Sequence, residues 1–523
     1  MNFLFLTQNK TLELFYEVSR ALEKKSELKK VGFYLADSTF YDTFKRQRPE
    51  ITSGSFELLK EWEIIEKSRH IRPDIRILRE YEGKLGDPVL WNALVADRRI
   101  YLGKRATLEQ DYPSRFGHER MLALIQTGLE EMAGMFDRVQ PDAVVGFICV
   151  TIGEYLAYLM ANSRGIPFLN LRPTRIKNYF YAGESVHEPS KRLEEAYQEA
   201  LTNGVPKDVE RQVCSYLTEV RETHAMYEGV LPTSRDTPPK KWNEVLGEVV
   251  SIVLGLGATT KKYYEYNFGK YKHDNHYPGS YYRLWFKKFK RPARIKYNDY
   301  YLRKHYISTH DLTSMDYLFY PLHKEPEVTL LVYSRPYMNQ MEVVRNLARS
   351  LPVGMKVIVK EHPASVGYRP LSYYKKLLSI PNVLIAFPHI TSRALVQSAK
   401  LVAIISGSIG LEAIMLKKPV IHFGNIPFSI ISDRMIRHIK QPDNLGWIIN
   451  ELLESHYHEE EALIAYLAAV MQNSVAVDFY TVLLGRKGAY KPDLNSWCNA
   501  TDYTRQIERL ALYLTQRLKM LQD

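Results

Sequence analysis

The sequence predicts an α/β protein built from two doubly wound domains. The chain has 523 residues, which is more than one hydrophobic core usually holds. Short apolar strands alternate with amphipathic helices near both ends, and a mainly helical stretch separates the two alternating regions. Hydrophobic residues make up 45% of the chain and charged residues 25%, as in ordinary globular proteins. We therefore expect the chain to be folded around two parallel sheets that face a cleft.

The first domain is expected to span residues 1–187. Strand patterns cover 2–6, 30–35, 142–147 and 167–171, and helix patterns cover 12–23, 117–136 and 151–164. Strands that alternate with helices in this way indicate βαβ units, whose strands run parallel in one sheet.

A helical insertion is expected over residues 188–310, with its clearest helices at 191–201, 208–227 and 242–254. The second domain should then span 311–455. Its expected strands are 329–333, 356–359, 383–386, 401–405 and 420–423, separated by helices such as 340–350 and 371–378. The tail, 456–523, is helical, and its last helix at 503–521 is long enough to pack across both domains.

Positive charge is concentrated in the insertion. The chain has a formal charge of +12, and residues 261–304 contain thirteen Lys or Arg against three acids. Aromatic rings are interleaved with these cations, as in the run Tyr281 to Arg291. This composition suits an anionic membrane surface or a polyanionic glycan, because cations attract the anions while rings settle at the interface. A solvated basic face is the alternative, and nucleic acid, which such a surface would also accept, is not the expected partner.

Cysteine usage and hydropathy indicate a cytoplasmic protein, held at most peripherally on the inner membrane. Cys149, Cys214 and Cys498 are scattered, so neither a disulfide framework nor a zinc site is predicted. The opening residues 1–6 are too short for a signal-peptide core and fit a buried first strand. The apolar windows contain acids and glycines, which argues against a membrane span.

Two strands of the second domain end in groups suited to binding phosphate. One ends in Lys360-Glu361-His362-Pro363 and the other in Ser406-Gly407-Ser408, which is followed by a helix beginning near Ile409. Because parallel strands end at the same sheet edge, these segments should share a nucleotide pocket. Hydroxyls and helix amides would bind the phosphate, with a donor from His362, whose direction Pro363 sets. Taken singly, each segment could equally be a capped turn or a plain loop.

The same pocket is expected to use two more side chains. Lys360 would add a positive charge at the strand end, and Glu412, one helical turn after Ser408, could accept hydrogen bonds from ribose hydroxyls.

Residues 317–425 resemble capsular-polysaccharide glycosyltransferases of the GT-B fold. This group includes bacterial Kdo transferases and bacterial sialyltransferases with His-Pro and Ser motifs. The resemblance is carried by the two segments above, by Tyr320 to Glu327 and by Tyr337 to Gln340. It implies a GT-B-like fold, a nucleotide-sugar donor bound by the His-Pro and Ser motifs, often a CMP-sugar, and no metal or other cofactor. UDP-GlcNAc epimerases share this fold and a similar glutamate, so the resemblance does not identify the nucleobase of the donor.

The catalytic group should come from the first domain. Glu154, at the start of the 151–164 helix, is the first candidate, and Asp37, after the 30–35 strand, is the second. Both could instead cap helices. Arg172 and Arg175 follow a strand end and could grip an acidic sugar or a phosphate, or form surface salt bridges. Gln340 is a further candidate for substrate binding.

Together these observations predict a glycosyltransferase that adds a sugar, Kdo or another acidic sugar, to a growing or lipid-linked bacterial surface polysaccharide. Two alternatives stay open. One is a sugar-nucleotide epimerase of the same fold, which needs no acceptor, and the other is a noncatalytic polyanion-binding protein built around residues 261–304.

Overall fold

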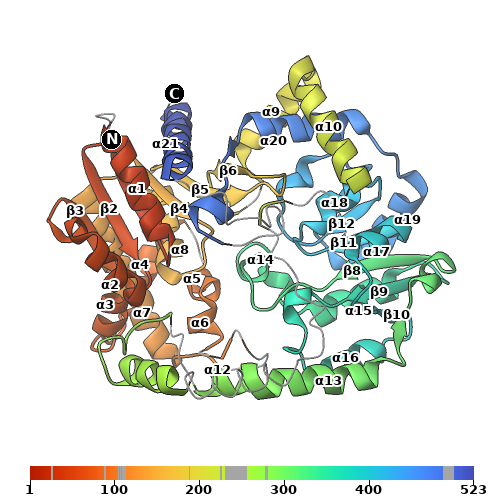
Figure 1. The fold of residues 1–523 in the computed structure, drawn as a ribbon, viewed down its shortest axis with the longest axis horizontal. Coiled ribbons are helices and arrows are strands. Elements are labelled where there is room, and N and C mark those ends of the chain that lie inside the picture. Colours follow the sequence, from red (N-terminus) through yellow and green to blue (C-terminus); the bar gives the residue numbers. More distant parts are fainter. Residues whose placement is uncertain are drawn as a thin grey trace.

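The chain folds around two seven-stranded sheets, each covered by helices on both faces (Figure 1). The structure is a computed structural model. It describes residues 1–24, 28–86, 90–103, 105–106, 108, 113–187, 189–223, 227–229, 256–276, 281–486 and 500–522. The predicted fold class, two doubly wound domains in a GT-B-like arrangement, is confirmed by this topology. The predicted helix at 242–254 lies outside the described residues.

The first sheet has the strand order β14-β6-β5-β4-β1-β2-β3. Its core is parallel, and only the pairs β5–β6 and β6–β14 are antiparallel. The strands are β1 (Asn2–Thr7), β2 (Lys30–Leu35), β3 (Phe56–Lys60), β4 (Ala143–Phe147), β5 (Phe168–Pro173), β6 (Tyr179–Gly183) and β14 (Val475–Ala476).

The second sheet has the order β13-β12-β11-β8-β9-β10-β7, with every pair parallel. The strands are β7 (Tyr306–Ile307), β8 (Tyr317–Pro321), β9 (Lys356–Lys360), β10 (Val383–Ala386), β11 (Leu401–Ile404), β12 (Val420–His422) and β13 (Ile436–His438).

Helices cover both sheets. The first domain contains α1 (Thr11–Lys24), α2 (Ser38–Gln47), α3 (Glu61–Lys67), α4 (Ile75–Leu85), α5 (Trp91–Ala96), α6 (Arg98–Tyr101), α7 (His118–Val139) and α8 (Ile152–Ser163). The insertion contains α9 (Lys191–Asn203), α10 (Lys207–Thr223), a helix at 256–267, α12 (Tyr281–Trp285), the π-helical turn η2 (Phe286–Lys290) and α13 (Arg291–Leu302). The second domain and tail contain α14 (Val328–Leu331), α15 (Gln340–Ser350), α16 (Leu371–Leu378), α17 (Ser392–Ser398), α18 (Ile409–Met415), α19 (Leu445–Ser455), α20 (Glu460–Gln472) and α21 (Ala500–Gln522).

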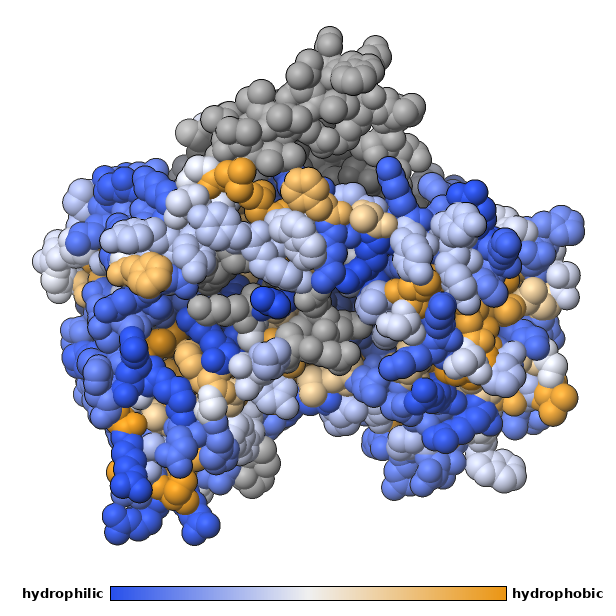
Figure 2. Space-filling view, turned by 90° about the horizontal axis from the view of Figure 1, so that it is seen from below, coloured by the Kyte–Doolittle hydropathy of each residue, from blue (hydrophilic) through white to orange (hydrophobic). Residues whose placement is uncertain are grey.

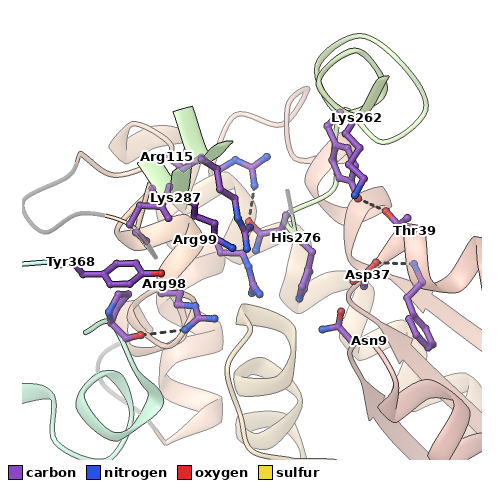
Figure 3. Close-up of a pocket in the computed structure, with 18 of the residues that line it drawn as sticks. Asn9, Asp37, Thr39, Arg98, Arg99, Arg115, Lys262, His276, Lys287 and Tyr368 are labelled. Atoms are coloured by element: carbon purple, nitrogen blue, oxygen red, sulfur yellow. Dashed lines mark hydrogen bonds between the residues drawn. The ribbon is translucent and has the colours of Figure 1, made fainter. Parts of the chain in front are cut away.

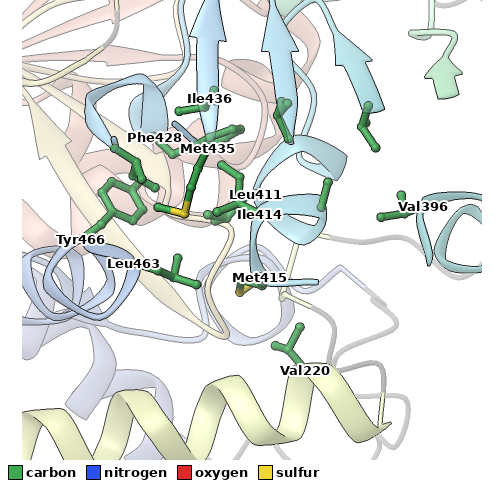
Figure 4. Packing of buried hydrophobic residues seen from close by; sticks show 14 of the residues in the cluster. Val220, Val396, Leu411, Ile414, Met415, Phe428, Met435, Ile436, Leu463 and Tyr466 are labelled. Carbon is green, nitrogen blue, oxygen red and sulfur yellow. The ribbon is translucent and has the colours of Figure 1, made fainter. Parts of the chain in front are cut away.

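Alternation along the strands explains why both sheet faces are covered. In β1, Phe3 and Phe5 belong to one buried cluster and Leu4 and Leu6 to another, because successive side chains point to opposite faces. A strand that is apolar on both faces is stable only between two layers of helices. In the second domain one such cluster joins Leu411 of α18 to side chains of α10 and α20 (Figure 4).

Two predicted elements differ from the structure. The expected strand at 329–333 is wrong: α14 occupies Val328–Leu331, and the strand lies earlier, at β8. Short apolar runs do not distinguish a strand from a buried helical turn. The last helix, α21, packs on α1 and the first sheet through Leu510 and Leu514 and does not span both domains.

Candidate functional site

Two cavities lie between the domains, at the edge where the strands of both sheets end. The smaller has a volume of about 320 Å³ and is lined by Ser406 to Ser408 and His362 of the second domain and by Arg172 and Arg175 of the first. We call it the serine cavity. The larger, about 590 Å³, is lined by arginines of α6 and α12 together with Asp37, and we call it the arginine cavity (Figure 3). Both volumes are in the range typical of small-molecule sites.

The serine cavity brings together residues that the sequence placed in separate segments. Of the predicted site residues, it is lined by His362, Ser406, Gly407, Ser408, Arg172 and Arg175. Asp37 lines the arginine cavity. The predicted residues that line neither cavity are Glu154, Gln340, Lys360, Pro363 and Glu412.

His362 is oriented as a neutral hydrogen-bond donor. Burial lowers the pKa of its imidazole to about 4, so the ring is uncharged at neutral pH. Its Nδ1 accepts a hydrogen bond from the Ala364 amide at 3.1 Å. A neutral imidazole that accepts at one nitrogen carries its proton on the other. His362 therefore has an Nε2–H to donate to a ligand in the serine cavity.

The three residues after β11 have different roles. Ser406 is fully buried, and its hydroxyl donates to the Thr329 carbonyl at 3.2 Å, so it holds this turn against α14. A Cβ on Gly407 would lie 3.3 Å from Cε1 of His323, so glycine allows close approach at this point. Ser408, at the N-cap of α18, makes no side-chain capping bond. Its hydroxyl is thus better placed than that of Ser406 to bind a ligand.

Arg175 joins the first domain to this turn. Its Nη2 donates to the Ser406 carbonyl at 3.2 Å, and its Nη1 is buried without a hydrogen-bond partner in the described part of the chain. Its backbone has a φ of 69°, and Ile148, which also lines the cavity, has a φ of 51°. Such left-handed conformations are costly for residues with side chains and cluster at functional sites. A buried N–H that is left without a partner suits an anionic ligand.

Arg172 is more firmly held. It is buried, donates from Nη2 to the Ser185 carbonyl at 2.9 Å, and lies 4.8 Å from the ring centre of Tyr333. It therefore contributes positive charge to the wall of the serine cavity from a fixed position.

A buried charge network, which the sequence did not predict, supports the wall of the serine cavity. The guanidinium of Arg369 is fully buried and donates to Glu361, and also to the His323 carbonyl at 2.7 Å. Glu361 in turn accepts from the His362 amide at 2.7 Å. Burial opposes the charge on Arg369, but Glu361 and Glu325 together hold its pKa above the ordinary value. Arg369 has no sequence signal, whereas Glu361 and His323 lie inside the two motifs already noted.

Gln340 and Lys360 act behind the cavity wall. The Gln340 amide accepts from the His323 amide at 2.7 Å and donates to the His323 carbonyl at 3.2 Å, so it fixes the backbone of that residue. Lys360 is buried and donates to the Ser392 hydroxyl at 3.4 Å. Burial lowers the pKa of His323 to about 3 and keeps its ring neutral.

Three carboxylates near the cleft have unusual surroundings. Glu154 forms the capping box of α8 and accepts from the amides of Val150 and Thr151 at 2.8 and 2.9 Å. This contact accounts for its position without a ligand. Asp37 caps α2 through the Phe40 amide, and burial raises its pKa to about 6. Glu327 lines the serine cavity, and burial raises its pKa as well. Asp37, Glu325 and Glu327 thus each line a cavity and have a raised pKa, and Glu325 is paired with Arg369.

Comparison with known families supports the motif interpretation. Residues 256–432 match the family described as "Capsule polysaccharide biosynthesis protein". This range contains His362 and the three residues after β11, so the predicted resemblance to capsule polysaccharide biosynthesis proteins is confirmed for this part of the chain. A comparison with curated proteins returns no match.

Solved structures similar to this chain include the beta Kdo 2,4 transferase KpsC of Thermosulfurimonas dismutans, at 13% identity over 70% of this chain and 87% of that one, with a TM-score of 0.34. A UDP-GlcNAc 2-epimerase of Neisseria meningitidis aligns at 11% identity over 90% and 98%, with a TM-score of 0.23. Anabaena Alr3699/HepE, in complex with UDP-glucose, aligns at 11% identity over 98% and 99%, with a TM-score of 0.25. Similarities this low do not distinguish between transfer and epimerisation.

Metal-binding clusters and membrane spans were predicted to be absent. In the described ranges, no group of three or more His, Cys, Asp or Glu side chains is arranged to hold a metal ion. No helix within those ranges is both long and apolar enough to cross a bilayer. Metal-independent chemistry stays a prediction.

Proposed function

We propose that this protein is a glycosyltransferase of capsule polysaccharide biosynthesis that binds a nucleotide-sugar donor in the serine cavity and a glycan or lipid-linked acceptor in the arginine cavity. The family match supports the general role in capsule biosynthesis. The assignment of the donor and the acceptor to two cavities rests on one observation: the cavities adjoin at the same edge of the cleft.

One short segment forms part of both cavities. Pro321 to His323 and Glu327 to Thr329 line the serine cavity, and Lys324 to Pro326 line the arginine cavity. Two ligands bound in these cavities would therefore meet along residues 321–329. An epimerase changes one bound sugar nucleotide and needs no second site, whereas sugar transfer needs two ligands side by side. The geometry favours transfer.

The lining of the serine cavity suits the leaving group of such a reaction. As the bond from the sugar to the donor phosphate breaks, its electron pair goes to a phosphate oxygen. The Nε2–H of His362, the hydroxyl of Ser408 and the guanidinium of Arg175 would stabilise this charge. Tyr333 and Tyr480 also line the cavity and provide ring faces for the nucleobase. With Arg172 nearby, the cavity would also accept the carboxylate of an acidic sugar such as Kdo.

Asp37 is our choice for the base that takes the proton from the acceptor hydroxyl. It lines the cavity assigned to the acceptor, and a pKa of about 6 leaves it ionised at neutral pH while keeping it more basic than an ordinary aspartate. The oxygen of the acceptor hydroxyl would then form the new bond to the sugar. Glu327, on the donor side, is the second candidate.

We also propose that α12, η2 and α13 place the enzyme on an anionic bilayer. These helices run along the underside of both domains (Figure 1). Their exposed rings include Trp285 and Phe289, 47% and 52% exposed, and Tyr300, 77% exposed. Figure 2, which views this underside, shows apolar side chains interleaved with hydrophilic ones. Rings and cations mixed in this way are typical of interfacial contact, and a lipid-linked acceptor would lie at that surface.

An assay with a panel of nucleotide sugars tests the proposal. The purified protein is incubated with each CMP- and UDP-sugar, with and without a capsule-derived acceptor, and products are followed by mass spectrometry. We expect release of nucleotide and growth of the acceptor by one sugar. An isomerised donor formed without acceptor would support the epimerase, and the absence of any turnover would support the noncatalytic polyanion-binding protein.

A further inference from the structure

We propose that His276, which the insertion places in the wall of the arginine cavity, binds a hydroxyl group of the acceptor sugar next to the one that Asp37 deprotonates. The sugar that receives the new bond would then carry two neighbouring hydroxyls, one for each side chain. Calling the ligand the acceptor rests on the proposed function, whereas the hydroxyl-binding position is argued from the surroundings of the ring.

The ring of His276 is buried in the cavity wall without a hydrogen-bond partner. Its side chain is 4% exposed, and neither Nδ1 nor Nε2 is in hydrogen-bonding geometry with another group. Among the described residues that line this cavity, His276 alone has buried side-chain polar atoms without a partner. The large majority of such atoms in folded proteins are paired, because leaving them unpaired is costly. The unpaired ring therefore indicates that a ligand supplies the partner.

The same ring is uncharged and can accept a hydrogen bond. Burial, followed by the charge of Arg99, lowers the pKa of His276 well below its ordinary value. The Ala36 backbone opposes this shift, as a carbonyl does when a ring N–H points toward it. A neutral imidazole that carries its proton on one nitrogen has a lone pair on the other. That second nitrogen needs a donor, so it suits a hydroxyl group and not a phosphate or a carboxylate.

Contacts on both sides hold His276 near Asp37. Asp274 is buried, and it accepts from the His276 amide at Oδ1 and from the Ser38 amide at Oδ2, the latter at 2.8 Å. The Ser38 hydroxyl donates to the same carboxylate. Because Ala36 lies near the ring and Ser38 is bonded to Asp274, the residue between these two contacts is Asp37. Figure 3 shows both side chains at the cavity.

The segment that carries the ring is fixed by side chains that do have partners. Asn275 donates from Nδ2 to Asp97 at 2.7 Å, and its Oδ1 accepts from Arg115 at 2.6 Å. Asp274 and Asn275 are therefore satisfied within the protein, and the next residue is not. A rigid segment that ends in an unsatisfied ring is suited to binding, since the ring is already oriented before a ligand arrives.

Titration with the capsule-derived acceptor in the absence of donor tests this role without any transfer reaction. His276→Leu keeps most of the bulk of the ring and has no acceptor, whereas His276→Gln and His276→Asn retain a side-chain oxygen that accepts. The control His273→Leu removes a histidine of the same segment that is equally buried, 9% exposed, but lies outside both cavities. We expect His276→Leu to bind roughly tenfold more weakly, one of the two amide variants to stay within about threefold of the unmodified protein, and the control within about twofold.

Four results would overturn the inference: no binding by the unmodified protein, full affinity in His276→Leu, equal loss in all three His276 variants, or equal loss in His273→Leu. Transfer kinetics and titration with CMP and UDP separate the two proposals. Binding that depends on His276, with no nucleotide bound and no turnover, would remove the transferase proposal alone. Transfer with the same acceptor KM in His276→Leu as in the unmodified protein would remove the role of His276 alone.

Discussion

Replacement of His362 tests the donor site most directly. The side chain offers a single N–H, at Nε2, because Nδ1 accepts from the Ala364 amide. A hydrogen bond to a charged partner contributes about 1.5–3 kcal/mol, which corresponds to roughly 10- to 150-fold in affinity. His362→Ala should therefore weaken binding of the donor nucleotide by that factor. The Ala364 amide is exposed to water, so the loss of its acceptor should change the free energy of unfolding by less than about 1 kcal/mol.

Two related variants test whether His362 donates from Nε2. The amide nitrogen of glutamine lies near the position of imidazole Nε2, so His362→Gln should retain part of the affinity, whereas the shorter His362→Asn should not. His389→Ala, which removes an exposed histidine outside both cavities, is the matched control. Affinities for CMP and UDP are measured by titration, and unfolding by urea. Unchanged nucleotide affinity in a folded His362→Ala protein would refute the assignment. Affinity should also be flat between pH 7 and 8.5, since a ring with a pKa of about 4 has already lost its proton.

The remaining predictions concern the base, the buried network and the membrane. Asp37→Asn should reduce the transfer rate by roughly 10²–10⁴-fold and leave nucleotide affinity unchanged. In the unmodified protein, transfer should decline as pH falls through about 6, because the base must be ionised; a flat profile from pH 5 to 8 would exclude this role. Arg369→Leu should lower the free energy of unfolding in urea by about 3–5 kcal/mol, since it leaves buried carboxylates unpaired, and a loss below about 1 kcal/mol would contradict that account. Trp285→Ser with Phe289→Ser should weaken sedimentation with phosphatidylglycerol vesicles by roughly a hundredfold or more, because burying each such ring contributes about 1.5–3 kcal/mol. Trp447→Ser, which also removes an exposed ring, should not weaken it, and equal binding by both variants would remove the membrane surface.

Much of the lining of the serine cavity could be predicted from sequence because its residues follow strands directly. The carboxyl ends of β9 and β11 must meet at one sheet edge, so the motifs around His362 and Ser406 were predicted to converge, and they do. Arg172 and Arg175 were found by the same rule in the first domain. Side chains whose role depends on burial were not predictable in this way. Nothing in the sequence around Arg369 indicates that it is buried against Glu361.

The role of each residue within the motifs also could not be predicted from the sequence. Ser406 and Ser408 look alike in the chain, but the Ser406 hydroxyl is bonded to a carbonyl, whereas Ser408 lines the cavity and makes no side-chain capping bond. Glu154 and Asp37 both follow strands and both cap helices, and only the packing of α2 against the insertion leaves Asp37 at a cavity wall. The basic segment was recognised as unusual, but its division into a cavity side and an outward side required the fold.

The Arg369 network gives the two cavities a fixed relative position. Arg369 bonds to Glu361, which holds the backbone of His362 beside the serine cavity, and it pairs with Glu325, which lines the arginine cavity. Arg369 and Glu361 are buried and Glu325 is partly buried. Moving either cavity wall would therefore separate charges in a medium of low polarity, which is costly. Transfer between two bound ligands requires their reacting atoms to be held about 3–3.5 Å apart, and a rigid element shared by both sites meets this need. In a folded Arg369→Leu protein, affinity for the nucleotide and for the acceptor should therefore fall together. Loss of only one of them would show that the two cavities are positioned independently.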